Sequence, residues 1–252
     1  MSGAMNAAEQ VTAKATGPES LSAESRATAA RLAESYRVSP LDMVPNPSPL
    51  LVESTEEVAV PTSNGLFGLR AWRFADGAEH LSARALDRDG NPVPYEGGGA
   101  PAVRIHSECA TGDIFGSFRC DCGPQLENGL RIIGRTGGYL VYVRNHEGRG
   151  IGLVNKLRAY ALQDAGLDTL DANLALGLDG DMRDYSQAAL ILQELGVHEM
   201  RLVTNNPAKQ EALEGLGLRV TELIPDEIPA RVENAHYLHT KRERMRHLLE
   251  RA

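Results

Sequence analysis

The pattern of hydrophobic and polar positions divides the chain into two unequal parts. Residues 1–50 are rich in Ala, Ser, Glu and Thr and contain neither Ile nor Phe. Their composition favours one short helix, over Ser22–Tyr36. Four prolines then fall between positions 40 and 49, a density that excludes a regular helix and is typical of an extended linker. We therefore predict that residues 1–48 form a mobile N-terminal extension and that residues 49–252 form one domain.

Short apolar or alternating segments predict strands through the first half of this domain. The segments are 50–62, 65–74, 83–87, 102–106 and 138–144. Asn64-Gly65 is a candidate hairpin turn. A helix is predicted over Pro124–Ile133, with the proline at a position that the first turn of a helix tolerates.

The second half alternates between the two periodicities. Apolar residues at helical spacing predict four helices, and two apolar runs between them predict strands. The helices are Leu153–Asp164, Tyr185–Leu195 with Asp184 as its N-cap, 207–217, and Asn234–Leu249; the strands are 200–204 and 218–224. Because strands are separated by helices, we predict a mixed α/β fold: a mixed sheet with some parallel pairing and flanking helices.

Composition narrows the classes of function. The 252 residues carry 26 Lys and Arg against 34 Asp and Glu, a net charge of −8. A general nucleic-acid binder needs a basic face, so we expect no nucleic-acid partner, although a local basic pocket is compatible with this charge. No apolar run is long enough to span a membrane, and the N-terminus lacks the apolar core of a secretory signal. We therefore expect a cytoplasmic protein without a membrane partner.

Three cysteines form the clearest chemical feature. Cys109, Cys120 and Cys122 lie within fourteen residues, and thiolates are ligands that suit Zn²⁺. His106 could complete a closed site of four ligands; without it, three ligands and a water would form an open site of the catalytic type. The alternatives are three inert buried thiols or a redox pair between Cys120 and Cys122, which a single intervening residue would strain.

Five segments occur in an order that resembles one enzyme family. They are RIHSECATGD, FRCDCGPQLE, HEGRGIGLVNKLRAYALQD, LGLDGDMRDY and TNNPAK. The chain resembles GTP cyclohydrolase II over about Leu51–Leu249, most densely over Arg104–Lys209. The resemblance implies the family's fold and a homodimeric zinc enzyme. It also implies the first reaction of riboflavin biosynthesis, in which GTP is hydrolysed to formate, pyrophosphate and 2,5-diamino-6-ribosylamino-4(3H)-pyrimidinone 5′-phosphate.

The same resemblance assigns roles to residues at the matching positions. The three cysteines would hold zinc. Asp181 would be the proton acceptor, Arg183 the nucleophile, and Tyr160 a tyrosine near the reacting ring. The residues that would contact GTP are Arg104, Ile105, His106, Ser107, Glu108, Gln125, Glu147, Gly148, Arg149, Thr169, Thr204 and Lys209.

Elementary chemistry agrees with several of these assignments. GTP carries about four negative charges, which Arg104, Arg149, Lys209 and a bound Mg²⁺ could neutralise. The glycines of EGRGIG allow backbone N–H groups to approach phosphate oxygens, although an ordinary tight turn has the same composition. Glu147 or Gln125 could recognise the edge of guanine, because a carboxylate or amide oxygen accepts hydrogen bonds from amino and imino groups.

Arg183 is an unusual nucleophile, because a guanidinium keeps its proton to a pH above about 12. Asp181 is its nearest candidate activator. Residues two apart do not share a face of a helix, so we expect this pair to lie on a loop or an extended segment. The alternative role for Arg183 is to stabilise charge in the transition state, as an arginine finger does.

Two features depart from the commonest family pattern. The loop RNHEGRG has one residue more than the frequent RQEGR form, and Leu178 replaces a common aromatic residue. Residues 1–50 are also too short to be the dihydroxybutanone-phosphate synthase domain that is fused to some relatives, so we expect a monofunctional chain. Two alternatives remain: a variant that stops at the ring-opened formamide, and a non-catalytic zinc protein that binds nucleotides.

Other residues have simpler expected roles. We predict that His146, His198 and His236 are surface histidines or form local hydrogen bonds. Trp72 is predicted to pack in the core or in a dimer interface. The run 241–244 is predicted to be the solvated face of a helix, although in a dimer it could approach the partner's nucleotide.

Overall fold

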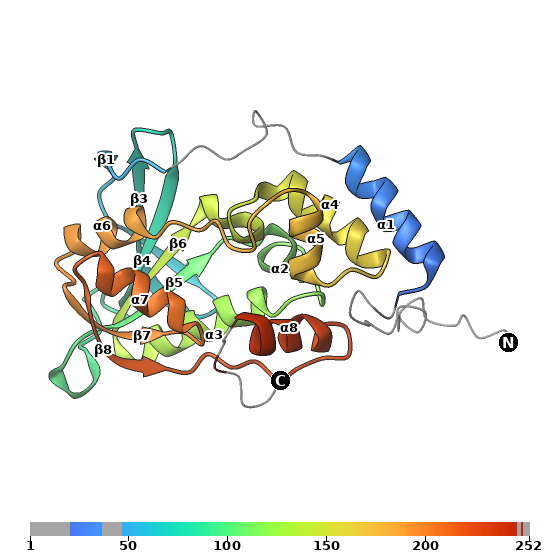
Figure 1. Ribbon diagram of the computed structural model, residues 1–252. Coiled ribbons are helices and arrows are strands. Elements are labelled where there is room, and N and C mark those ends of the chain that lie inside the picture. The colour runs from blue at the N-terminus through green and yellow to red at the C-terminus, as the bar shows by residue number, and fades with distance from the viewer. Residues whose placement is uncertain (1–20, 37–46, 246–247, 249–252) are drawn as a thin grey trace, which may run out of the picture.

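The computed structural model describes residues 21–36, 47–245 and 248. Its centre is an eight-stranded mixed sheet in the order β1-β3-β4-β6-β5-β7-β8, with β2 also paired to β3 (Figure 1). The strands are β1 (Leu51–Ser54), β2 (Val58–Thr62), β3 (Gly65–Phe74), β4 (Glu79–Leu86), β5 (Ala102–Ser107), β6 (Gly138–Val143), β7 (Glu199–Val203) and β8 (Arg219–Ile224).

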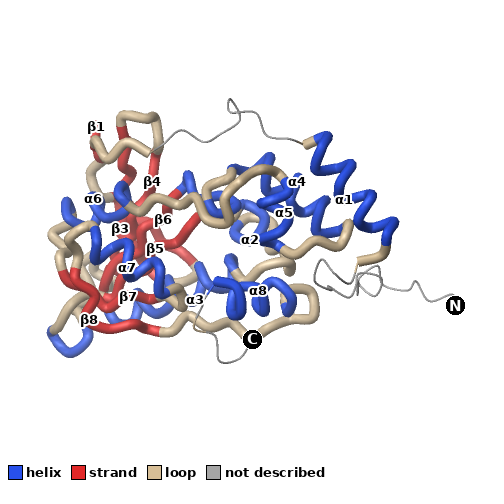
Figure 2. The backbone as a smooth tube through the Cα atoms, viewed as in Figure 1, coloured by secondary structure: helices blue, strands red, loops and turns tan. Residues whose placement is uncertain are grey.

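Helices surround the sheet and extend to one side of it. Figure 2 shows the strands gathered in one half of the molecule and α1, α4, α5 and α8 in the other. The helices are α1 (Ala23–Ser35), α2 (Ala110–Asp113), α3 (Cys122–Thr136), α4 (Gly152–Asp164), α5 (Thr169–Ala175), α6 (Ser186–Glu194), α7 (Pro207–Gly215) and α8 (Ala235–Met245), with 3-10 segments η4 (Glu96–Gly98) and η5 (Arg144–Arg149).

The sheet changes from antiparallel to parallel along its width. Strands β1–β4 and β6 pair antiparallel, whereas β5 pairs parallel with both β6 and β7, and β7 with β8. The predicted mixed α/β fold is therefore confirmed. The predicted strand segment 50–62 contains two strands, β1 and β2, which pair with different ends of β3. The predicted hairpin is present, and its turn is Ser63-Asn64 because Gly65 already pairs with Thr62.

Alternating strand positions fill two cores, one on each face of the sheet. On one face, Val103 and Ile105 of β5 pack with Ile191 and Leu192 of α6. On the other face, Ala102 and Leu140 pack with Phe67, Ala83, Ala85, Ile133 and Val203. Trp72 is buried in the first core, as predicted, and its indole N–H donates to Ser82 Oγ at 2.9 Å.

A third core holds the helical half together. Leu162 of α4 and Leu176, which follows α5, are fully buried there, and Leu32 of α1 packs against them. The helix predicted over Ser22–Tyr36 is therefore confirmed as α1, with Ser22 as its N-cap. Leu178, which stands where relatives often have an aromatic residue, is buried in the same core.

Some predictions lie outside the described residues. These concern most of the proline-rich linker, the end of the last helix beyond Met245, and the side chain of His236. Within the described part of the chain, no helix is long and apolar enough to cross a membrane.

Parallel pairing determines where a site can form. Ser107, at the end of β5, pairs with Val143, at the end of β6, and β7 ends at Val203 on the other side of β5. The carboxyl ends of the three strands therefore meet at one edge, which is where open α/β sheets bind ligands.

Gly138 makes the β5–β6 pairing possible. It begins β6 at φ +142°, and a Cβ there would lie 1.9 Å from the carbonyl oxygen of Ala102, its partner in β5. We expect Gly138→Ala to lower the free energy of unfolding by about 3 kcal/mol or more, measured by urea denaturation. Gly90→Ala is the control, because its φ of +82° is strained but nothing lies within 4 Å; we expect a cost of about 1–2 kcal/mol there. Equal costs for the two variants would show that the close approach of Ala102 does not restrict position 138.

Candidate functional site

A cavity opens at the carboxyl ends of β5, β6 and β7, between the sheet and the helical half. It encloses about 1090 Å³, part of it open to solvent, which is enough for a nucleotide. Most of the predicted site residues line it, namely Arg104, His106, Ser107, Glu108, Cys109, Cys120, Cys122, Gln125, Gly148, Arg149, Tyr160, Thr169, Arg183, Thr204 and Lys209. Ile105, Glu147 and Asp181 do not line the cavity.

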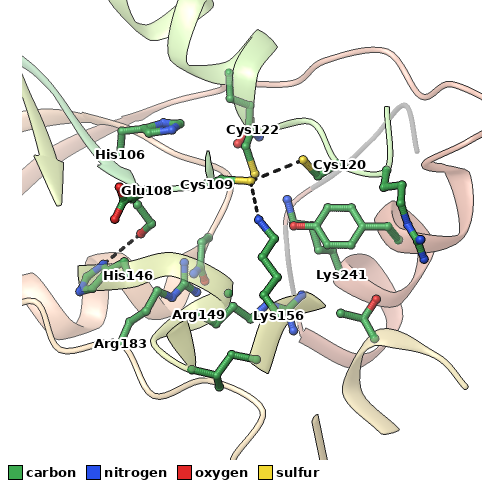
Figure 3. A pocket seen from close by; sticks show the side chains of 18 of the residues that line it. His106, Glu108, Cys109, Cys120, Cys122, His146, Arg149, Lys156, Arg183 and Lys241 are labelled. Carbon is green, nitrogen blue, oxygen red and sulfur yellow. Dashed lines mark hydrogen bonds between the residues drawn. The ribbon is translucent and has the colours of Figure 1, made fainter. Parts of the chain in front are cut away.

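The three cysteine thiols converge at one wall of the cavity (Figure 3). Their sulfur atoms all lie within 4.8 Å of one another, and Cys109 Sγ is 3.7 Å from Cys120 Sγ. Thiolates around a tetrahedral zinc, with Zn–S bonds of about 2.3 Å, lie about 3.8 Å apart. A Cβ on Gly112 would lie only 3.0 Å from Cys120 Sγ and 3.2 Å from Cys109 Sγ, so the sulfur atoms crowd this glycine. The donor set and its spacing fit one zinc ion.

His106 does not join the cysteine cluster. Its Nε2 lies 3.1 Å from both carboxylate oxygens of Asp113. Asp113 Oδ2 also accepts from Tyr142 Oη at 2.8 Å and from the backbone N–H of Cys109 at 3.0 Å. The cluster of candidate ligands in the described residues contains the three cysteines alone. The described residues therefore bring together three candidate ligands, the number that the open arrangement requires.

Positive side chains crowd the opposite part of the cavity. Arg104 on β5 pairs with buried Asp226 at 2.8 Å, and Lys209 on α7 donates to the carbonyl of Ile105 at 2.7 Å. Burial and the guanidinium groups of Arg104 and Arg183 lower the pKa of Lys209 well below its ordinary value. An anionic ligand beside Lys209 would favour the charged form of its ammonium.

Arg149 offers a guanidinium whose terminal nitrogens form no hydrogen bond with the described residues. Both of these nitrogens are buried. Its backbone adopts φ +67°, the positive-φ conformation that non-glycine residues rarely adopt, between Gly148 and Gly150. Strained backbone conformations of this kind gather at functional sites, and a buried unpaired guanidinium is a ready partner for phosphate.

Asp181 and Arg183 form a pair on the irregular segment between α5 and α6, as predicted. Arg183 donates to Asp181 Oδ1 from its backbone N–H at 3.1 Å and from Nε at 2.8 Å, and Nη2 contacts Oδ2. Burial would raise the pKa of Asp181, but the hydrogen bonds and charge of Arg183 hold it below its usual range. For Arg183, burial opposes the charge, but Tyr185 and Asp181 outweigh it and raise the pKa. The pair is therefore ionised in the absence of ligand.

Tyr160 on α4 lines the cavity. Its hydroxyl lies 3.5 Å from Thr111 Oγ1, and the guanidinium of Arg119 lies 4.2 Å from the centre of its ring. Burial raises the pKa of Tyr160, so its hydroxyl keeps its proton at neutral pH. The side chain is available as a proton donor.

These features are the ones that the five sequence segments carry, and comparison with known proteins gives their family. The profile of one family, described as GTP cyclohydrolase II, matches residues 53–225. The chain belongs to the GTP cyclohydrolase II family. That match spans all three cysteines and every predicted contact for GTP.

Individual relatives are longer than this chain. The riboflavin biosynthesis protein RibBA of Rhodococcus jostii is 52% identical over 198 residues, which are 78% of this chain and 47% of that protein. RibBA of Mycobacterium marinum is 51% identical over 197 residues, or 78% and 46%. The chain thus spans about half the length of the curated relatives it matches.

One solved structure has a weak similarity. It is RibBX, a two-domain 3,4-dihydroxy-2-butanone 4-phosphate synthase from A. baumannii, with a TM-score of 0.36 at 19% sequence identity. The alignment covers 78% of this chain and 44% of that one. A similarity of this size supports no inference.

Several cavity residues of this family member were not predicted from the sequence, among them Arg119, Lys156, Tyr237 and Lys241. The prediction that Lys241 lies on a solvated helix face is wrong. It is buried, its ammonium lies 2.8 Å from Asp121 Oδ1, and it stacks 4.5 Å from the centre of the Tyr237 ring. Asp121 stands between two cysteines and is itself buried, so it needs a cation, and this Cys-Asp-Cys sequence is the signal that could have indicated one.

The histidine predictions have mixed outcomes. His198 is exposed, as predicted. His146 is buried at the wall of the cavity rather than at the surface, and it forms the predicted local hydrogen bonds. Its Nε2 donates to the carbonyl of Asp184 at 2.8 Å, which leaves Nδ1 to accept from Ser107 Oγ at 3.1 Å. The neutral imidazole therefore links the end of β5 to the segment that carries Arg183.

His146 should make the fold sensitive to acid. Burial, and secondly the Arg183 charge, lower the pKa of His146 to about 3, so this side chain takes up a proton on unfolding at any pH between about 3 and 6.5. The free energy of unfolding should fall as pH drops through that window, by up to about 1.4 kcal/mol per unit from this residue. We expect urea denaturation at pH 7.5 and pH 5 to show a smaller pH dependence for His146→Gln than for the wild type. His198→Gln is the exposed control and should keep the full dependence; an unchanged dependence in His146→Gln would refute the assignment.

Proposed function

We propose that this chain is a zinc-dependent GTP cyclohydrolase II of riboflavin biosynthesis. It would hydrolyse GTP to formate, pyrophosphate and 2,5-diamino-6-ribosylamino-4(3H)-pyrimidinone 5′-phosphate. The observation that carries the proposal is that one cavity holds both a three-thiol cluster and several cations, of which Arg149 and Lys209 have no carboxylate partner among the described residues. A ring-opening hydrolase needs the first for activating water, and a nucleoside triphosphate needs the second.

Cys109, Cys120 and Cys122 would hold the zinc ion. Zinc with three protein ligands supplies a hydroxide near neutral pH and polarises the bond under attack. The chain's own contribution is placement: α2 and the start of α3 hold the thiols together, and Asp113 fixes the backbone N–H of Cys109. This support would hold the thiols close to the reacting base. The imidazole ring of guanine must be opened at C8, and the resulting formamide must then be cleaved.

The positive side chains would bind the triphosphate of GTP. The phosphates would also carry a Mg²⁺ ion. Arg149 can form a bidentate pair with phosphate, whereas Lys209 acts as a point charge. Thr204 and the N-terminus of α7 lie beside Lys209, where Asn206 caps the helix by accepting from the N–H of Ala208. Loss of pyrophosphate builds negative charge on this part of the ligand, and fixed cations stabilise that charge without reorganising.

Tyr160 and the Asp181–Arg183 pair would act nearest the chemistry. Tyr160 keeps its proton and can donate it to the leaving nitrogen of the opened ring. Arg183 is ionised through its contact with Asp181, which favours stabilisation of developing charge at the α-phosphate. A covalent role for Arg183 would require Asp181 to accept its proton first.

Further proposals follow from the same family. We propose that Gln125 and the 104–108 segment orient the base and sugar, that Thr169 contacts the nucleotide, and that the enzyme is a cytoplasmic homodimer. Residues 1–48 would then be an extension of the catalytic domain 49–252.

Product analysis tests the proposed reaction. We expect purified, zinc-loaded protein with GTP and Mg²⁺ to release formate, pyrophosphate and the diaminopyrimidine monophosphate, identified by mass spectrometry. Tyr160→Phe should slow formate release by about 100-fold, because it removes a general acid. Arg183→Ala should abolish turnover.

The other outcomes separate the alternatives. A product that retains its formyl group would identify a variant that stops at the ring-opened formamide. GTP binding without turnover would replace the proposal by a non-catalytic role.

Metal analysis tests the zinc site separately from turnover. We expect one zinc per chain by mass spectrometry of the purified protein, and none in Cys109→Ser. Gly112→Ala should weaken zinc binding at least about 10-fold, because its Cβ would crowd two sulfur atoms. Gly116→Ala in the same loop has open space around the new Cβ and should bind zinc as the wild type does. Full zinc content in Cys109→Ser would exclude this cluster as the metal site.

A further inference from the structure

Lys156 lies between the cysteine cluster and the loop that follows β6. It stands on the second turn of α4, and its side chain is 9% exposed. The ammonium lies 3.0 Å from Cys109 Sγ and 2.6 Å from Glu147 Oε1 (Figure 3 shows the contact with the sulfur). Both partners belong to the chain, so this buried ammonium already has hydrogen-bond partners within the protein before any ligand binds.

Glu147, the second partner of Lys156, also accepts two backbone hydrogen bonds. Its Oε2 accepts from the backbone N–H of Ala110, the residue after Cys109, at 2.6 Å. Its Oε1 also accepts from the N–H of Gly148 at 3.0 Å. Both carboxylate oxygens are thus used inside the protein, and the residue does not line the cavity. This arrangement favours a structural role for Glu147 over recognition of the guanine edge.

Gly148 shows how closely the loop and the lysine pack. At φ +60° a Cβ on Gly148 would lie 3.1 Å from Lys156 Cβ and 2.8 Å from Ile151 Cγ1. The loop therefore rests directly on the aliphatic stem of Lys156, next to Arg149 with its unpaired guanidinium. A displacement of Lys156 would move the cysteine turn and this loop together.

The charge of Lys156 suits the group it contacts. Three thiolates and one Zn²⁺ sum to a net charge of about −1, and an ammonium donor stabilises a buried thiolate. The other lysines in the described residues are engaged elsewhere, Lys209 with the Ile105 carbonyl and Lys241 with Asp121. Lys156 is thus the lysine placed to act on the cysteine cluster.

We infer that Lys156 is a positioning residue: through its bonds to Cys109 and Glu147, it holds the proposed zinc site and the 144–150 loop in one fixed geometry. The inference rests on the proposed zinc site. It assigns Lys156 no contact with GTP, and it makes Glu147 the second half of the same connection. Outer-sphere partners of metal ligands typically change metal affinity by about 10–100-fold when they are removed.

Zinc affinity in the absence of GTP tests the inference. We expect Lys156→Met to weaken zinc binding about 10–100-fold in competition with a chromophoric chelator. The cobalt-substituted variant should also show an altered thiolate-to-cobalt charge-transfer band. Lys156→Arg keeps the charge and should stay closer to the wild type. Glu147→Gln should weaken zinc binding as well, and adding it to Lys156→Met should cost little more, because both variants break one connection.

Controls separate this role from a general loss of stability. Arg158→Met removes a cation from the same helix without touching the cysteines and should leave zinc affinity and the cobalt spectrum unchanged. Should Lys156→Met fail to fold, the Glu147→Gln measurements decide. Zinc affinity within two-fold of the wild type and an unaltered cobalt spectrum in Lys156→Met, or in Glu147→Gln when Lys156→Met does not fold, would overturn the inference. A wild type that binds zinc but does not turn over GTP would overturn the proposed function alone.

Discussion

The parallel pairing of β5 with β6 and β7 is the constraint on which the site depends. Parallel strands all end at the same edge, so the segments that follow them must leave the sheet side by side. The cysteine turn follows β5, the glycine-rich loop follows β6, and the Thr204 segment follows β7. The short helices α2 and η5 in these segments do not bring one segment to another; the register of Ser107 opposite Val143 does so instead.

The site also shows how an acidic protein can prepare for a polyanion. Its net charge is −8, yet Arg104, Arg149, Arg183 and Lys209 share one cavity. Two of them are balanced, Arg104 by Asp226 and Arg183 by Asp181, while Arg149 and Lys209 have no carboxylate partner of their own among the described residues. The class of ligand therefore depends more on where charges are placed than on the net charge of the chain. Repulsion among these cations also lowers the stability of the ligand-free site.

The sequence predicted the features that are local or periodic. Strand alternation, the helix over 22–36, the cysteine spacing and the loop position of Asp181 and Arg183 all follow from neighbouring residues, and the structure agrees with them. The division of segment 50–62 into two strands depends on which part of β3 each half pairs with. The local sequence pattern does not predict this pairing.

Long-range pairs were the other features that could not be predicted from the sequence. Lys156 reaches Cys109 across 47 positions, and Lys241 reaches Asp121 across 120. Both lysines lie on helices whose charged residues look solvent-facing when the helix is considered alone. Only the partner of each lysine indicates that a cation is needed: the thiol cluster for Lys156 and the buried Asp121 for Lys241.

The pair between Lys241 and Asp121 has a consequence for the order of assembly. All eight strands precede α8 in the chain, so they leave the ribosome before it does. Until α8 arrives, Asp121 has a carboxylate beside two cysteines and lacks the ammonium that neutralises it in the finished fold. The growing chain can therefore complete its sheet while the Asp121 carboxylate in its cysteine turn still lacks a cation. Only when the last helix packs does Lys241 neutralise that charge, so the electrostatics of the cavity depend on the last element to be synthesised.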